Sequence, residues 1–147
     1  MATFVSATFT GTQFTELSAA DANWSKQSGF TADIVTGSDG ASATSAAAVT
    51  YAVYQHSGTP ASADYSVFSD LTWISGSAVS PQIGVIGRAA AGAGTFYFTL
   101  YIKASNQLRL YKCVSGTFTQ LGSNYSLTLT NGVAQNHELR MSGSTIS

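Results

Sequence analysis

Residues 83–121 form a run of short apolar segments separated by turn-forming residues. Within these segments, aromatic and β-branched residues alternate with small or polar ones, and Gly, Ser, Asn and Ala fill the gaps. Such alternation is typical of half-buried antiparallel strands joined by tight turns. The block therefore predicts consecutive β-hairpins, with strands at residues 84–89, 96–102, 108–114 and 118–121.

The rest of the chain fits the same all-β class. Apolar runs bounded by turn residues predict strands at residues 4–9, 30–35, 49–54, 64–74, 125–129 and 138–141. The strand at 64–74 is expected to be bent or bulged, because its apolar side switches along its length. Residues 41–48 are Ala- and Ser-rich, and we expect a short helical turn or a loop there. With 147 residues and no linker, the chain is expected to form a single domain, residues 1–147.

The last residues indicate an incomplete sheet. Ser142 and Gly143 predict a hairpin turn, and residues 144–147 begin a strand that stops almost at once. The partner strand for residues 139–141 is then missing, cut off or supplied by another chain. An unpaired strand edge favours the addition of a strand from a neighbour.

The low charge of the chain excludes one class of partner and favours another. Charged residues make up 9% of the sequence, against about 25% in an average protein. The Lys and Arg residues are too few and too scattered to neutralise a phosphate backbone, so we expect no nucleic acid partner. A weakly charged surface offers little repulsion against self-association. This composition fits a subunit of a homo-oligomer or larger assembly, and it fits an extracellular surface equally.

No membrane span and no secretion signal are expected. The chain has no run of about 18 apolar residues, the length that a membrane span requires. Residues 1–6 lack both the basic region and the continuous apolar region of a signal peptide. The protein is therefore expected to be made and folded in a cytoplasm.

Four conspicuous side chains are interpreted as structural. Cys113 is the single cysteine, so it cannot form an internal disulfide, and its place in a strand predicts a small buried residue. Trp24 and Trp73 are predicted to lie in the core. Arg88 is flanked by apolar residues, which predicts an internal hydrogen-bonding role rather than ligand binding.

Several short segments occur in the order in which one protein family carries them. They are residues 63–67 (ADYSV), 84–89 (GVIGRA), 110–118, 121–123 and 139–146 (LRMSGSTI). Together they resemble the concanavalin A-like (laminin-G-like) jelly-roll modules common in bacteriophage virion proteins and some bacterial surface proteins. The resemblance covers nearly the whole chain and implies a two-sheet antiparallel β-sandwich with a role in binding or virion architecture. In such modules the segment matching residues 143–146 leads into a further strand, so this domain is expected to lack its last strand or strands.

No catalytic or metal site is predicted. Some jelly rolls of this type are glucanases, which use two carboxylates about 5–5.5 Å apart. A strand supplies such a pair at positions i and i+2, and no two acidic residues have this spacing. His56 and His137 lack a neighbouring acid or nucleophile motif. Asp33, Asp39 and Asn131 are candidate calcium ligands, but no loop concentrates acidic residues. We expect a non-enzymatic protein with no cofactor and no metal.

The central hairpin strands predict one candidate surface for a ligand or a protein interface. The apolar side of the strand at 96–102 is expected to face the core; it carries Phe96, Phe98, Leu100 and Ile102. The opposite sides of this strand and the next would share an outer face; its candidate residues are Tyr97, Tyr101, Arg109 and Tyr111. Tyrosine rings there could stack on sugars or on a neighbouring protein, or lie half-buried beneath a loop or second subunit.

Two functions from different classes stay open. The first is a bacteriophage virion structural protein, a head-decoration or tail/fibre-associated subunit that packs against other virion subunits. The second is a carbohydrate-binding adhesin module that recognises host cell-surface glycans through the tyrosine face. The missing signal peptide, the scarce charge and the unfilled edge favour the first, which places the protein in the virion.

Overall fold

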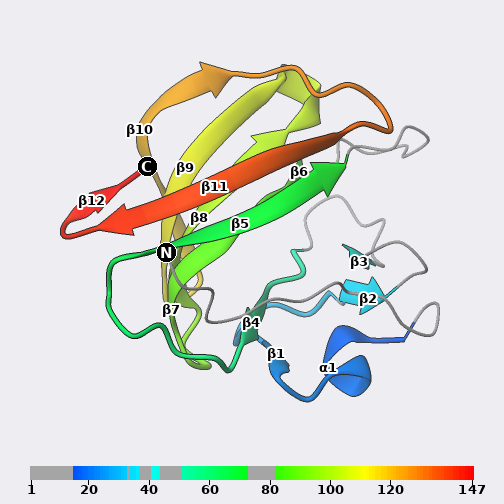
Figure 1. The fold of residues 1–147 in the computed structure, drawn as a ribbon, viewed down its shortest axis with the longest axis vertical. Coiled ribbons are helices and arrows are strands. Elements are labelled where there is room, and N and C mark those ends of the chain that lie inside the picture. Colours follow the sequence, from blue (N-terminus) through cyan, green and yellow to red (C-terminus); the bar gives the residue numbers. More distant parts are fainter. Residues whose placement is uncertain (1–14, 33, 37–40, 44–50, 73–81) are drawn as a thin grey trace. The chain divides into compact units, whose positions relative to one another are not determined.

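The computed structural model describes residues 15–32, 34–36, 41–43, 51–72 and 82–147 (Figure 1). The chain divides into two compact units. The N-terminal unit comprises Met1–Ala61 with Ala91–Gly94, and the sandwich unit comprises Ser62–Ala90 with Thr95–Ser147. The expectation of a single domain stays a prediction.

The described part of the N-terminal unit contains one short helix and two small antiparallel sheets. Its elements are α1 (Leu17–Ala20), β1 (Trp24–Lys26), β2 (Ile34–Thr36), β3 (Ala41–Ala43) and β4 (Tyr54–His56). Strand β1 pairs with β4, and β2 pairs with β3. The strands are therefore shorter than predicted, and residues 41–43 form a strand instead of a helical turn or loop. The strand predicted at 4–9 lies outside the described residues.

Glu16 holds the start of α1 through its carboxylate. Its Oε2 accepts a hydrogen bond from the backbone N–H of Ala19 at 3.1 Å and from the hydroxyl of Ser18 at 2.5 Å. The hydroxyl of Tyr54 donates to Oε1. Hydrogen bonds from Ser18 and then Tyr54 lower the pKa of the Glu16 carboxyl. This N-cap satisfies backbone groups that a helix of four residues leaves open.

Gln27 is a buried polar residue that ties the N-terminal unit together. Its backbone N–H donates to the Val53 carbonyl at 2.9 Å, and its Nε2 donates to Oε1 of Gln55. Its own Oε1 accepts the backbone N–H of Gly94 at 3.1 Å. These hydrogen bonds satisfy the polar atoms of Gln27, whose burial would otherwise destabilise the folded protein.

The first sheet of the sandwich unit is the predicted hairpin block. It contains β6 (Gln82–Ile83), β7 (Ile86–Ala90), β8 (Thr95–Ile102), β9 (Gln107–Val114) and β10 (Thr117–Ser126). The order is β10-β9-β8-β6, with β7 also paired to β8, and every pairing is antiparallel. A 3-10 turn at Lys103–Ser105 joins β8 to β9. The prediction of consecutive hairpins is confirmed.

The second sheet of the sandwich unit contains β5 (Tyr65–Thr72), β11 (Ala134–Ser142) and β12 (Thr145–Ile146), in the order β12-β11-β5. Strands β5 and β11 pair without a register shift, so β5 has no bulge over residues 65–72, and the alternative of a bend stays a prediction. The apolar pattern of β5 breaks because Phe68 lies on the outer face, where it is 57% exposed. Of the strand predicted at 125–129, Tyr125 and Ser126 belong to β10.

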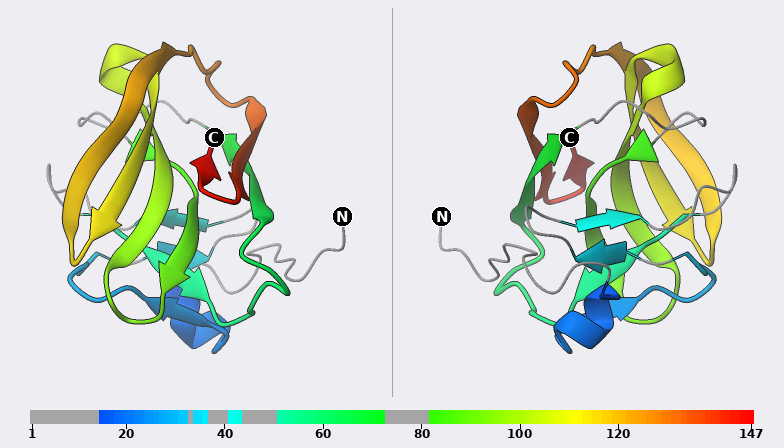
Figure 2. Two further views of the ribbon diagram at one scale, coloured as in Figure 1. Left: turned by 90° about the vertical axis from the view of Figure 1, so that its left-hand side faces the viewer. Right: turned by 90° about the vertical axis from the view of Figure 1, so that its right-hand side faces the viewer.

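The two sheets of this unit face each other around a common core (Figure 2). Val85, Leu139 and Met141 form its buried centre, and four half-buried residues pack against it: Tyr65, Val67, Leu110 and Ile146. Gly87 permits this close packing, because a Cβ at that position would collide with the Met141 sulfur. The unit is an all-β antiparallel sandwich, as predicted.

Candidate functional site

The four predicted site residues do not share one face of the first sheet. Phe98 lies opposite Tyr111 and Leu100 opposite Arg109, whereas Tyr97 and Tyr101 lie opposite other residues of β9. Because directly opposed residues of neighbouring strands point to the same face, Arg109 and Tyr111 lie on the face of Phe98. The expectation of a shared outer face is therefore wrong. The connection at residues 103–106 sets the register between β8 and β9. Alternation within a single strand does not indicate which residues of the next strand lie opposite it.

Tyr101 lies in the interior of the sandwich instead of on an outer face. Its side chain is 2% exposed. The hydroxyl donates to Oδ1 of Asn106 at 3.0 Å and accepts the backbone N–H of Leu129 at 3.3 Å. Tyr97 is half-buried on the same side of β8. Both faces of β8 are therefore buried. The sequence pattern marked one side of the strand as apolar but did not indicate that the polar side is buried as well.

Arg109 and Tyr111 are the predicted pair that the structure does bring together. Nη1 of Arg109 donates to the Tyr111 hydroxyl at 3.4 Å, and Nη2 donates to Oε1 of Gln107 at 2.7 Å. The Tyr111 ring stacks on Phe98 with centroids 5.1 Å apart. All three polar side chains are half-buried. We call Gln107, Arg109 and Tyr111 the β9 strip; it combines a fixed guanidinium with an aromatic ring.

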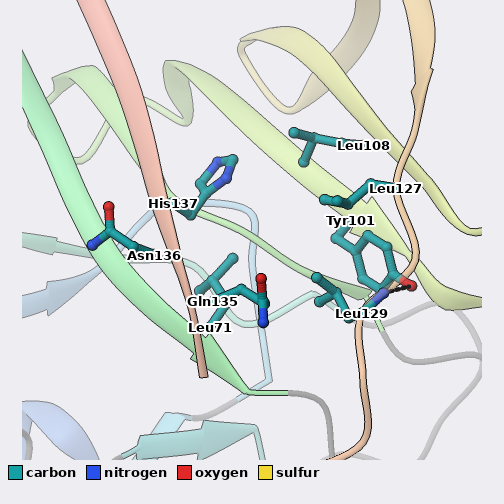
Figure 3. Close-up of a pocket in the computed structure, with 8 residues that line it drawn as sticks. All are labelled: Leu71, Tyr101, Leu108, Leu127, Leu129, Gln135, Asn136 and His137. Atoms are coloured by element: carbon teal, nitrogen blue, oxygen red, sulfur yellow. Dashed lines mark hydrogen bonds between the residues drawn. The ribbon is translucent and has the colours of Figure 1, made fainter. Parts of the chain in front are cut away.

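A small cavity lies inside the sandwich, beside β11 (Figure 3). Its volume is about 70 Å³, and its lining is Leu71, Tyr101, Leu108, Leu127, Leu129, Gln135, Asn136 and His137. Sites for small-molecule ligands typically occupy about 300–1,000 Å³. The cavity is therefore too small to hold a sugar or a cofactor.

The side chain of His137, on β11 of the second sheet, reaches β8 of the first sheet beside this cavity. Its Nε2 lies 2.6 Å from Oγ1 of Thr99, and the backbone N–H of Val85 donates to the same Oγ1 at 3.5 Å. Burial lowers the pKa of the His137 imidazole. Through these contacts His137 joins the two sheets. The residues next to it in the sequence give no sign of this role, because Thr99 is 38 residues away.

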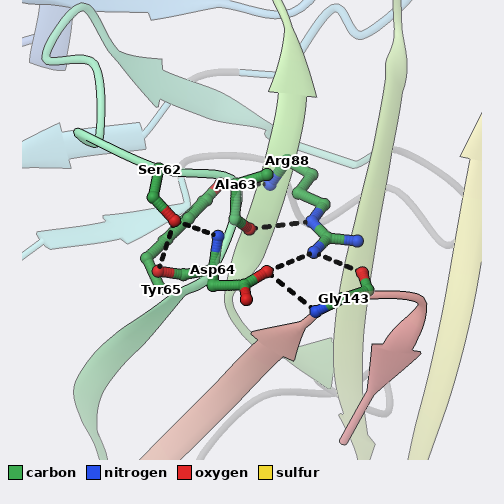
Figure 4. A network of polar contacts seen from close by, with 6 residues as sticks. All are labelled: Ser62, Ala63, Asp64, Tyr65, Arg88 and Gly143. Atoms are coloured by element: carbon green, nitrogen blue, oxygen red, sulfur yellow. Dashed lines mark hydrogen bonds and ion pairs between the residues drawn. The ribbon is translucent and has the colours of Figure 1, made fainter.

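Arg88 connects three segments that are distant in the sequence (Figure 4). Its Nε donates to the Ala63 carbonyl at 3.1 Å, and its Nη2 donates to the Gly143 carbonyl at 2.8 Å. Nη2 also lies 3.5 Å from Oδ1 of Asp64, which accepts the Gly143 N–H at 2.8 Å. The backbone N–H of Arg88 donates to the hydroxyl of Tyr65. The predicted structural role of Arg88 is confirmed.

Strand β12 covers only one end of the outer edge of β11. Met141 pairs with Ile146 and Ser142 with Thr145, and Arg140 exchanges two backbone hydrogen bonds with Ser147, at 2.7 and 3.0 Å. Among the described residues, no strand pairs with residues 134–139 on this side. We call this stretch the open edge. The sequence predicted a missing partner for residues 139–141, and that prediction is wrong for Arg140 and Met141, which pair with Ser147 and Ile146 of the same chain.

The alternation of an antiparallel ladder fixes which groups the open edge presents. Arg140 directs its N–H and C=O toward Ser147 and away from β5. Because backbone groups alternate in direction along a strand, Ala134, Asn136 and Glu138 point theirs the same way. All three residues are exposed. The open edge therefore offers alternating donors and acceptors to an added strand.

The remaining predicted site and core residues have ordinary roles or lie outside the described residues. His56 accepts the backbone N–H of Gly58 at 2.8 Å and packs edge-on against the half-buried Trp24. Cys113 is buried, as predicted, and burial raises the pKa of its thiol. Trp73 and the candidate calcium ligands Asp33 and Asp39 lie outside the described residues.

In the part of the chain that the structure describes, no three His, Cys, Asp or Glu side chains are grouped so that they could hold a metal ion. Its helices include none that is long and apolar enough to cross a membrane.

Comparisons with known proteins leave the family open. No family model, curated protein or solved structure matches the chain. The likeness to concanavalin A-like modules therefore stays a prediction.

Proposed function

We propose that this protein is a non-enzymatic structural subunit of a larger assembly, a bacteriophage virion component of the head-decoration or tail/fibre-associated kind. The open edge of β11 is the observation that carries the proposal. Exposed strand edges readily pair with other chains, so proteins that stay monomeric usually blunt or cover them. No strand of the described residues covers residues 134–139 at this edge, and such an edge suits a subunit whose neighbours complete its sheet.

Composition and fold support the same proposal. With 9% charged residues, the chain has little electrostatic repulsion to keep copies apart. The antiparallel sandwich is compatible with the concanavalin A-like jelly roll that the sequence resembles, and we propose that topology for the unit. Within a virion, such a subunit would act by packing against other subunits and displaying its surface.

Sedimentation velocity over a wide range of protein concentrations tests the assembly role. We expect the mean mass to rise with concentration as subunits associate. An antibody against the chain should also label purified virus particles. A chain that stays monomeric even at millimolar concentration, and an antibody that labels no particle, would overturn the proposal.

A carbohydrate-binding adhesin module is the second candidate, and the β9 strip favours it. A half-buried tyrosine ring with a guanidinium held beside it offers both a stacking surface and hydrogen-bond donors for a sugar. A glycan array tests this candidate: Tyr111→Ala should abolish binding. Lys112→Ala, on the other face of β9, is the matched control and should bind as the parent does. An array with no bound glycan removes the candidate.

A further inference from the structure

The first sheet of the sandwich unit carries positive charge and no carboxylate of its own. Residues 71–137 include no Asp or Glu, but they include four basic residues: Arg88, Lys103, Arg109 and Lys112. Of these, Arg88 lies 3.5 Å from the carboxylate of Asp64, which belongs to the segment before β5. The sheet therefore has an excess of positive charge, which favours a negatively charged ligand.

Arg109 is fixed by hydrogen bonds but is not neutralised. Among the described residues, no acidic side chain forms an ion pair with it. Its guanidinium donates to Oε1 of Gln107 from Nε at 3.2 Å and from Nη2 at 2.7 Å, and to the Tyr111 hydroxyl from Nη1 at 3.4 Å. A guanidinium has more N–H donors than these bonds use, so each terminal nitrogen keeps one for a further acceptor. Such a pair of donors matches the two oxygens of a carboxylate.

The β9 strip lies on the face of the first sheet that points away from the second sheet. Leu110 packs against the core between the sheets, and side chains alternate along a strand, so Arg109 and Tyr111 point to the opposite face. The Tyr111 ring stacks on Phe98, which holds the hydroxyl beside the guanidinium. Both side chains are half-buried, and partial removal from water strengthens the attraction between a guanidinium and an anion.

A bulge in β10 places polar side chains beside the strip. The register shift of this strand sets residues 122–124 opposite Arg109. Gln120 lies opposite Tyr111 and donates through Nε2 to Oδ1 of Asn124 at 2.8 Å. Both amide side chains are exposed, and amides offer donors and acceptors together, as the hydroxyls of a sugar require. The surroundings of Arg109 therefore suit a hydroxylated ligand better than the apolar side chains of a peptide.

We propose that the β9 strip binds the carboxylate of an acidic sugar, a uronic or sialic acid residue of a cell-surface glycan. The inference rests on the carbohydrate-binding candidate proposed above and names its ligand class; it does not depend on whether the protein assembles. The remaining N–H groups of Arg109 donate to the carboxylate. The Tyr111 hydroxyl and the amides of Gln120 and Asn124 bond the hydroxyls of the ring.

A glycan array that carries each acidic glycan beside its methyl ester tests this ligand class with the full chain. Esterification removes the charge and leaves the rest of the sugar unchanged. We expect the acids to bind more tightly than their esters by about tenfold or more. Equal binding of acids and esters overturns the inference and leaves the carbohydrate-binding candidate standing, whereas an array with no bound glycan overturns both. Preference for sulfated glycans, or equal binding of poly-glutamate, overturns the assignment of a sugar carboxylate.

Arginine variants test the position of the site. Arg109→Gln should lower the affinity for the acidic glycans by about tenfold or more, and Arg109→Lys should lose less, because it keeps the charge without the planar fork. The matched control is Arg140→Gln, which removes the same charge from an exposed position of β11 and should bind as the parent does. Equal losses in Arg109→Gln and Arg140→Gln, or unchanged affinity in Arg109→Gln, overturn the site. If thermal unfolding shows that Arg109→Gln does not fold, the comparison of acids with esters in the parent protein still decides the ligand class.

Discussion

Nε2 of His137 lies 2.6 Å from Oγ1 of Thr99, so one side-chain contact joins the two sheets across the interior of the sandwich. Burial lowers the pKa of this imidazole, which means that the folded protein resists its protonation more than the unfolded chain does. Stability is therefore full above the unfolded-state pKa of about 6.5. It is lost as the pH falls through the lower, folded-state pKa, because the unfolded chain then binds more protons.

Urea unfolding as a function of pH measures this effect. The midpoint should decline below about pH 6.5 in the parent protein, since an unfolded histidine is about half-protonated at that pH and more so below it. His137→Gln should flatten that decline. Equal slopes in the parent and His137→Gln proteins would show that His137 does not carry the pH dependence.

Tyr101→Phe should destabilise the protein although it removes a single oxygen. The Tyr101 hydroxyl bonds both Asn106 and the backbone N–H of Leu129, and its loss leaves buried polar groups without this partner. We expect a cost of about 1–3 kcal/mol in the free energy of unfolding. Tyr125→Phe is the matched control, with almost no cost because the residue is 66% exposed. Equal losses in chemical denaturation would contradict the role given to Tyr101.

Arg88→Lys should loosen the attachment of the turn between β11 and β12. Lysine keeps the charge but cannot reach Ala63, Asp64 and Gly143 with a planar fork of donors. A loss of about 1–3 kcal/mol is expected, together with faster amide exchange at Gly143. Arg140→Lys, at an exposed position of β11, should have little effect. The account of the Arg88 network would fail if both variants lost the same stability.

Two glycines of the block should differ in their tolerance of alanine. A Cβ at Gly84 would meet the backbone carbonyl of Thr99, whereas a Cβ at Gly87 would meet the flexible end of Met141. The Met141 side chain can move, so Gly87→Ala should cost about 1–3 kcal/mol, in the range of an overpacked core. Gly84→Ala should cost clearly more, because backbone must shift. Thermal unfolding of the two variants ranks them, and the reverse order would refute the packing described.

The hairpins could be predicted because their signal is local. Alternation and turn residues between 83 and 121 suffice to place β8 and β9 within a residue or so. The grouping of Tyr97, Tyr101, Arg109 and Tyr111 could not be predicted, since it depends on the register between two strands. The same holds for Phe68, whose exposed outer position breaks the apolar pattern of β5 without any bulge.

The candidate site was predictable in part. The hairpin of β11 and β12 could be predicted from its turn residues, Ser142 and Gly143. The backbone groups that the open edge presents depend on the pairing of β11 with β5 and β12. Long-range pairs such as Thr99 with His137 and Arg88 with Gly143 leave no local pattern.

A residue-resolved density map of the assembled protein would test the central claim most directly. The account predicts that the open edge of β11, residues 134–139, is buried against a neighbouring subunit. An assembly in which this edge faces solvent, while subunits touch elsewhere, would contradict the account.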